Sequence, residues 1–247
     1  MQARVVGAAE GARWVLRGWR IFRAAPVGWV AIVMAYLLVV LIASSIPGIG
    51  IAVIALATPA FSVSFMAVAR SASTAGSVQL PQLFEGFRQG LRTQLVLGAV
   101  YFACIVAAIG LTALVTGTRP GAEADASEPA PGAGAAAAFA LFLLLYLPTV
   151  MAFWFAPVLA AWHSVGTAKA LFFSFFACLM NWRAFLAYGV VLAALIFALS
   201  AAAVLAARLL MPGMDATRLA LPMLIVVYPT VLASYYASYR DVFAETP

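Results

Sequence analysis

The most polar helical face in the apolar part of this sequence lies near the carboxyl end. Its hydroxyl-bearing residues are Tyr228, Ser234, Tyr235, Tyr236, Ser238 and Tyr239. Hydroxyl groups in this arrangement can line a crevice that binds a ligand. They can equally hydrogen-bond to neighbouring helices or lie in an interfacial belt. The candidate crevice lining combines Tyr235 and Ser238 with Ser62 and Ser64 of an earlier segment.

Other residues that could carry chemistry stand alone. The single histidine, His163, lacks partners for a metal site, and Cys104 and Cys178 match no metal or redox spacing. The acidic residues of segment 117–134 can hold a divalent cation, but the composition of the segment favours a solvated linker instead. No phosphate-binding glycine loop, catalytic Ser/His/Asp set or carboxylate pair can be assembled. We therefore expect no catalytic residue, no cofactor and no metal, and the protein is not expected to be an enzyme.

The composition indicates that these side chains are set in a membrane. Of the 247 residues, 66% are hydrophobic and 9% charged, with a mean hydropathy of +1.07. A hydrocarbon core about 30 Å thick needs roughly 20 apolar residues of helix. Six uncharged runs meet that length, which predicts an all-α fold with one transmembrane domain over residues 1–247. The runs are 27–46, 49–69, 93–115, 136–161, 184–207 and 219–239.

The basic residues predict how the six helices are oriented, because cytoplasmic loops carry an excess of Lys and Arg. Arg119, Arg208 and Arg218 fall on one side of the membrane. The other side holds Arg4, Arg13, Arg17, Arg20, Arg23, Arg70, Arg88, Arg92, Lys169, Arg183 and Arg240. We therefore place both termini in the cytoplasm and segment 117–134 outside, as a flexible loop. The net charge of +6 follows from this asymmetry and from attraction to anionic headgroups, and no basic domain remains to bind nucleic acid.

A nine-residue pattern recurs along the chain and predicts an internal repeat. PTVMAFWFA at 148–156 returns as PTVLASYYA at 229–237, and PAFSVSFMA at 59–67 is a looser third copy. When the copies are aligned on Pro59, Pro148 and Pro229, the sixth following residue is aromatic and the eighth is alanine. Since proline removes an amide donor and bends a helix, we expect a kink at each of the three.

A stretch rich in aromatic residues and ending in arginine precedes each odd-numbered run. These stretches, which we call elbows, are 16–23, 83–92 and 171–183. The repeat unit is therefore an amphipathic elbow helix, an ascending helix and a bent descending helix, over approximately 12–70, 82–162 and 170–240. Units of the same orientation are related by an axis along the membrane normal, which predicts three helical hairpins around a pseudo-threefold axis. The alternative is a chance alignment of helices rich in proline and alanine.

The elbows are expected to anchor the protein at the membrane surface. Arg13 lies just before the first elbow, and on a continuous helix it shares one sector with Arg17 and Arg20. These arginines can therefore reach lipid phosphates while nearby rings enter the acyl chains. Asn181 can cap the helix after it, and Glu85 can pair with Arg88. The predicted anchors are Arg13, Trp14, Arg17, Trp19, Arg20, Arg88, Arg92, Trp182 and Arg183. Recognition of a particular lipid or of a partner is the alternative to plain anchoring.

Three stretches resemble a family of uncharacterised six-span inner-membrane proteins from proteobacteria. They are PVLAAWHSVGTAKALFFSFFACLMNWRAFLAYG at 157–189, GWRIFRAAPVGW near the start and YYASYRDVF near the end. The likeness covers most of the chain outside 117–134. It implies a multi-pass protein of the bacterial inner membrane, and it brings no activity or site residue with it.

Two functions remain open from the sequence. The first is a non-catalytic scaffold whose elbows and hairpins organise lipid or a membrane protein partner. The second is a passive transporter of lipid or a small solute, with a path between the bent even-numbered helices. The absence of charged residues from the six runs argues against ion-coupled transport. A packed seam of alanine and aromatic residues favours the scaffold, whereas a continuous cavity at the candidate crevice favours transport.

Overall fold

The computed structural model describes residues 3–117, 133–210 and 217–243, and the regular structure in these ranges is helical. The elements are α1 (Ala8–Ala24), α2 (Pro26–Ser44), α3 (Gly50–Ala75), the 3₁₀ helix η1 (Leu80–Phe84), α4 (Glu85–Arg88), α5 (Leu91–Thr116), α6 (Ala133–Trp154), α7 (Ala156–Trp162), α8 (Thr167–Met180), α9 (Trp182–Leu210) and α10 (Thr217–Phe243). Five helical segments in the described ranges are long and apolar enough to cross a membrane, with α6 and α7 counted together. They match the first five predicted runs. The sixth run, 219–239, lies within α10, which is not among those five.

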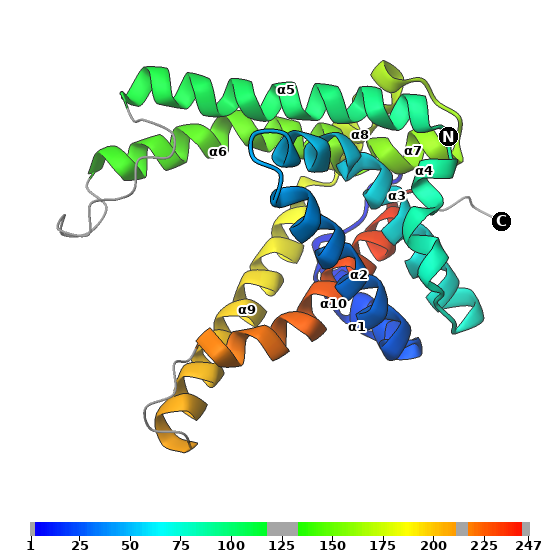
Figure 1. Cartoon of the computed structure of the whole chain (residues 1–247), viewed down its shortest axis with the longest axis vertical. Helices are drawn as coiled ribbons and strands as arrows, with labels where there is room; N and C mark the ends of the chain where they lie inside the picture. The colour runs from blue at the N-terminus through cyan, green and yellow to red at the C-terminus, as the bar shows by residue number, and fades with distance from the viewer. Residues whose placement is uncertain (1–2, 118–132, 211–216, 244–247) are drawn as a thin grey trace.

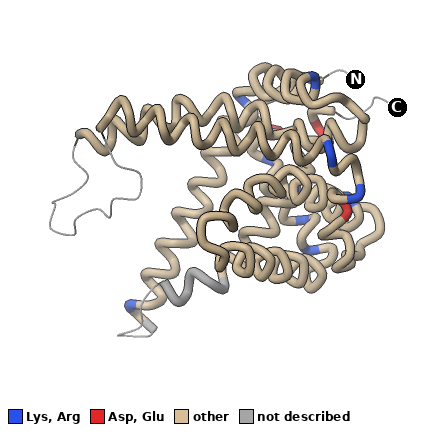
Figure 2. The backbone as a smooth tube through the Cα atoms, turned by 45° about the horizontal axis from the view of Figure 1, so that its top comes forward, with Lys and Arg blue, Asp and Glu red and all other residues tan. Residues whose placement is uncertain are grey.

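The long helices form three pairs that share one end of the molecule. Figure 1 shows α5 with α6 and α9 with α10 extending from that end in different directions, with α2 and α3 between them. The two chain termini lie at the shared end, where the Arg4 N–H donates to the Val242 carbonyl at 2.8 Å. Most Lys and Arg residues lie there as well (Figure 2). The distribution of positive charge therefore separates the two ends of the molecule.

Each elbow packs on the descending helix of the preceding pair. Elements η1 and α4 pack on α3, and α8 packs on α6 and α7. The first elbow, α1, packs mainly on α10 and also fills the space between α9 and α10, which touch each other little. The last descending helix therefore supports the first elbow, and the three contacts form a closed cycle.

The contact between α1 and α10 depends on a glycine. Gly18 lies against the Thr230 carbonyl and against Ser234, and a Cβ at Gly18 would collide with that carbonyl. Glycine is the residue that lets two backbones approach this closely in a membrane.

The contact between α4 and α3 has the same construction. Gly86 lies against the Ala60 carbonyl and the Ser64 hydroxyl, where a Cβ would again collide with the carbonyl. The Gly86 N–H donates to Ser64 Oγ at 2.9 Å. In both contacts the carbonyl belongs to the residue after the aligned proline, Pro59 or Pro229, and the serine is five residues after it. The two elbows therefore use equivalent positions of their descending helices.

The third elbow packs on its descending helix through a serine. Ser174 of α8 donates from Oγ to the Met151 carbonyl at 2.8 Å and accepts from the Phe155 N–H at 2.8 Å. In an unbroken helix these two backbone groups would bond to each other. The helix instead continues through Pro148 and is interrupted at Phe155, between α6 and α7. A kink was expected at Pro148, and the break between α6 and α7 lies seven residues after it, next to Pro157 at the start of α7.

The second elbow differs from its prediction. Residues 83–92 were expected to form one amphipathic helix, but they comprise the end of η1, the four-residue α4 and the start of α5. Gly90 has a φ of +69°, a left-handed conformation that favours glycine and separates α4 from α5. Glu85 lies 3.8 Å from the Arg70 guanidinium, so its ion pair joins α4 to α3 and is not the predicted pair with Arg88.

The interior consists of two hydrophobic clusters at the shared end. One is built mainly from α1, α7, α8, α9 and α10, and the other from α1, α2, α3 and η1. Tyr235 and Tyr239 of α10 pack against both. The three aligned alanines, Ala67, Ala156 and Ala237, are all buried. The packed seam of small and aromatic residues is thus present at this end.

Candidate functional site: a central cavity

A partly open cavity of about 260 Å³ lies where the three helix pairs meet. Residues of α3, α5, α6, α7, α9 and α10 line it, so each pair contributes to its wall. Its hydroxyl-bearing lining residues are Thr58, Ser62, Tyr101, Tyr146, Tyr188 and Tyr235. The remaining lining is apolar or aromatic, and no Asp, Glu, Lys or Arg of the described residues lines it. The cavity suits an uncharged group.

The tyrosine hydroxyls of the wall are held by hydrogen bonds between helices. The Tyr101 and Tyr146 hydroxyls of α5 and α6 are 2.9 Å apart. The Tyr188 hydroxyl of α9 is 2.7 Å from Ser234 Oγ of α10. A hydroxyl offers one donor and two acceptor positions, so each has capacity left for a ligand. The wall is therefore preorganised without being saturated.

An aromatic layer, which we call the floor, closes the cavity toward the chain termini. The Tyr235 hydroxyl donates to the Trp154 carbonyl, and the two ring centroids are 5.4 Å apart. The residue after Trp154, Phe155, is fully buried. Its ring centroid lies 5.1 Å from that of Phe243 and 6.4 Å from that of Tyr239. Five aromatic side chains therefore separate the cavity from the end that carries the termini.

Two of the four predicted crevice residues line the cavity. Ser62 and Tyr235 do so, whereas Ser64 is used in the contact with α4. Ser238 is also engaged elsewhere, because its Oγ donates to the Tyr235 carbonyl at 2.7 Å and accepts from Trp154 Nε1 at 3.3 Å. The two serines fall on the packed faces of their helices, beside the cavity and not in its wall.

Three of the tyrosines in the wall were not among the predicted crevice residues. Tyr101, Tyr146 and Tyr188 each stand in a different apolar run. The hydrophobic residues around each tyrosine give no polar pattern that would have singled it out. An isolated tyrosine in the middle of a membrane helix was the available signal, since its hydroxyl needs a partner there.

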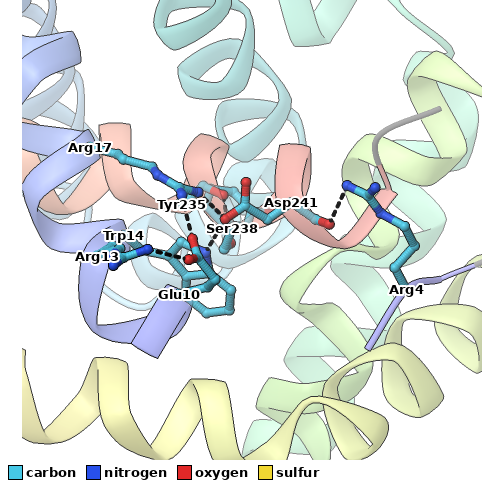
Figure 3. A network of polar contacts seen from close by, with 8 residues as sticks. All are labelled: Arg4, Glu10, Arg13, Trp14, Arg17, Tyr235, Ser238 and Asp241. Atoms are coloured by element: carbon cyan, nitrogen blue, oxygen red, sulfur yellow. Dashed lines mark hydrogen bonds and ion pairs between the residues drawn. The ribbon is translucent and has the colours of Figure 1, made fainter. Parts of the chain in front are cut away.

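A polar network at the shared end fixes α1 against α10 (Figure 3). Trp14 Nε1 donates to the Asp241 carboxylate at 2.9 Å. The Arg17 guanidinium pairs with both Asp241 and Glu10, and Arg13 pairs with Glu10 at 2.6 Å. Since α1 begins at Ala8, Glu10 belongs to the first elbow helix, which was not expected.

The predicted interface anchors fall into two groups. Trp14 is fully buried in the protein, so its ring does not enter the acyl chains as expected, and Arg17 is largely committed to the network with Asp241. The residues on exposed positions are Arg13, Trp19, Arg20, Arg88, Arg92, Trp182 and Arg183. For these the anchoring role stays a prediction.

Asn181 holds the amino-terminal segment instead of capping α9 with its side chain. Its Oδ1 accepts from the Val6 N–H at 2.7 Å, and its Nδ2 donates to the carbonyls of Arg4 at 3.0 Å and Ala177 at 2.8 Å. Its backbone carbonyl accepts from Ala184 and Phe185 at the start of α9.

The isolated candidates for metal chemistry are placed as follows. His163 Nε2 lies 2.7 Å from the Tyr239 hydroxyl, next to the floor. Burial raises the pKa of the Cys178 thiol well above its usual range, which keeps that thiol protonated. Among the described residues no group of His, Cys, Asp and Glu could hold a metal ion. The acidic residues of segment 117–134 lie outside the described residues.

These features define a helical membrane protein that crosses the bilayer several times. The chain is 36% identical to a probable inner membrane protein of Burkholderia thailandensis, over 98% of its own length and 94% of that protein. The chain belongs to the same family of bacterial integral inner-membrane proteins, as the resemblance of its sequence implied. No protein-family model matches the chain. No solved structure matches it.

Proposed function

We propose that this inner-membrane protein is a non-catalytic scaffold that organises lipid and holds an uncharged part of a lipid in the central cavity. The observation that carries this proposal is the uncharged, hydroxyl-bearing cavity at the junction of the three helix pairs. At about 260 Å³ it falls just below the roughly 300–1,000 Å³ typical of sites for whole small molecules. A chain segment or a small ring fits it, and a complete phospholipid does not.

The floor favours a scaffold over a transporter. A passive path from the cavity to the cytoplasm would have to pass Phe155, which is fully buried, and would have to separate Trp154 from Tyr235. Passive transport of lipid or a small solute remains the second candidate because the cavity is partly open and the proline-bearing helices α3 and α10 both line it.

The proposal includes an orientation and an internal symmetry. The clustering of Lys and Arg beside the termini supports a cytoplasmic location for both termini. Gly18 and Gly86 each contact the residues that stand one and five positions after an aligned proline. This equivalence supports a pseudo-threefold arrangement of three hairpins, with α10 crossing the membrane as the sixth span. Anionic lipids are then the expected partners at the basic end.

Filling the cavity tests the proposed function. Val150 lines the cavity, and Leu144 on the same helix is 69% exposed. Val150→Trp should occupy the space that the lipid needs, whereas Leu144→Trp adds the same ring at a surface position. Native mass spectrometry of the protein released from mild detergent should show one more retained lipid for the parent chain and for Leu144→Trp than for Val150→Trp.

Three results would contradict the scaffold. If the parent chain retains no lipid, or if Val150→Trp retains as many lipids as the parent chain, the cavity is not the binding site. If the parent chain mediates solute uptake in liposomes and Val150→Trp abolishes it, passive transport is the correct function.

A further inference from the structure

A second pocket, of about 280 Å³, lies between α1, α3 and α10 at the end that carries the termini. Arg17, Arg20 and Arg240 line it together with Ser73, and we call it the basic pocket. Arg17 and Arg20 project from one face of α1 because they are three residues apart, and Arg240 approaches from the end of α10. Among the described residues, none that lines the pocket is acidic.

Two of the three guanidiniums form no ion pair with a described residue. Arg17 is paired with Glu10 and Asp241, and Glu10 is also paired with Arg13. These two arginines and two carboxylates together carry no net charge. Arg20 and Arg240 are exposed, and neither takes part in an ion pair within the part of the chain that the structure describes. Two uncompensated cations that face one pocket repel each other, and an anion placed between them removes that repulsion. Arginine suits phosphate because its planar donors bind two oxygens at once.

Exposed apolar side chains of α1 lie next to the arginines in sequence. Leu16, four residues before Arg20, is 57% exposed, and Trp19 beside it is 39% exposed. Both line a groove of about 330 Å³ between α1, α9 and α10, whose walls are apolar except for Thr230. Thr230 lies ten residues before Arg240 on α10, which corresponds to about 15 Å of helix. That distance matches half of a hydrocarbon core about 30 Å thick.

We propose that the basic pocket binds the phosphate of an anionic phospholipid, whose acyl chains lie along Leu16 and Trp19. This proposal rests on the proposed cytoplasmic orientation, because it places the lipid in the inner leaflet. The site is separate from the central cavity, and its ligand is selected by charge. A zwitterionic lipid carries its own cation next to the phosphate and therefore competes poorly for two free guanidiniums.

The test measures lipid binding to the full chain by native mass spectrometry in mild detergent. Phosphatidylglycerol and phosphatidylcholine are titrated separately against the parent chain, against the double variant Arg20→Gln/Arg240→Gln, and against Lys169→Gln/Arg208→Gln. The last variant loses the same charge at exposed positions outside the pocket. We expect one tight phosphatidylglycerol site that the first variant weakens by about tenfold or more and the control leaves unchanged.

Further arms distinguish the sources of phosphate and guard against misfolding. Arg20→Lys/Arg240→Lys keeps the charge without the paired donors, so its affinity should fall between those of the parent and the glutamine variant. Glycerol 3-phosphate should fail to displace the lipid. Equal loss in the two glutamine variants, equal binding of phosphatidylcholine, or displacement by glycerol 3-phosphate would overturn the proposal. Val150→Trp should keep this site, so a failure of the central cavity and a failure of the basic pocket give different results.

Discussion

Asp241 joins more groups than any other acidic residue described in the structure. Its carboxylate accepts from Trp14 and Arg17, and its backbone carbonyl accepts from the Arg4 guanidinium at 3.1 Å. The side chains of Arg17 and Asp241 are 25% and 17% exposed, so solvent screens this pair less than a surface pair. One carboxylate therefore ties the first elbow and the amino-terminal segment to the last helix.

Removing this charge should destabilise the fold. Asp241→Asn keeps the shape of the side chain but replaces charge-assisted hydrogen bonds with neutral ones, which should lower the free energy of unfolding by roughly 1–3 kcal/mol. SDS titration in mixed micelles measures the change. Arg92→Gln, at an exposed position without a described ion pair, is the control and should have little effect. Equal stability of Asp241→Asn and the parent chain would show that the network contributes nothing.

At the scale of the helices, serine hydroxyls replace missing backbone contacts. Ser174→Ala would leave the Phe155 N–H and the Met151 carbonyl without their partner inside the protein, and Ser64→Ala would do so for the Gly86 N–H. Each should cost roughly 1–3 kcal/mol, because a buried polar group without a partner keeps its full desolvation cost. Ser62→Ala is the matched control.

The control follows from the contacts of Ser62. Its hydroxyl donates only to the Thr58 carbonyl of its own helix, so its loss should be nearly neutral. Melting temperatures in one detergent compare the three variants. A loss for Ser62→Ala as large as for Ser174→Ala would contradict the special role of the serines between elements.

The glycines at the elbow contacts should tolerate no added carbon. Gly18→Ala and Gly86→Ala place a Cβ against a backbone carbonyl, so the helices must separate, and we expect a loss of roughly 1–3 kcal/mol for each. Gly189→Ala in α9 adds a Cβ where nothing lies within 4 Å. There the better helix propensity of alanine should leave stability equal or slightly higher. Similar melting temperatures for all three variants would show that the close approach is not required.

The elements divide clearly into those that the sequence could predict and those that it could not. Length and hydropathy were sufficient for the first five membrane runs, because each depends only on its own residues. The break at Phe155 has a local signal in Pro157 at the start of α7, but the hydroxyl that bonds to the freed backbone groups comes from Ser174 in another element and was not predictable. Only part of the cavity lining was predicted. Ser62 and Tyr235 stand close in sequence to the aligned prolines, whereas Tyr101 and Tyr188 reach the cavity only through the packing of helices. Trp14 was misplaced because its partner Asp241 lies at the far end of the chain.

At the scale of the whole molecule, the chain closes on itself without a covalent link. The second and third elbows follow directly in sequence the helices that support them, α3 and α7. The first elbow meets α10 only through packing, the Asp241 network and the bond from the Arg4 N–H to the Val242 carbonyl. If the three contacts are equivalent, the position of the chain ends within the cycle is arbitrary.

A circular permutant tests this equivalence. It joins the end of the chain to its start through a short Gly/Ser linker and opens it between Ser164 and Val165, in the connection between α7 and α8. Both the new link and the new ends lie at the end of the molecule that carries the natural termini, so no helix changes direction. We expect the permutant to insert into the membrane, to retain the same lipid and to melt within a few degrees of the parent chain.

The permutant also predicts a change in the effect of Asp241→Asn. A covalent link between α10 and α1 lowers the entropy lost when they associate, so fraying of this contact becomes less favourable. Asp241→Asn should therefore lower the free energy of unfolding less than it does in the parent chain.

The control permutant opens between Gly48 and Ile49, in the turn between α2 and α3, which sends both new ends to the opposite side of the membrane. It should fail to assemble, because α3 would then begin the chain. In the natural chain, the insertion of α2 brings the start of α3 to that side of the membrane. Equal behaviour of the two permutants would show that the cycle of elbows does not determine how the molecule is held together.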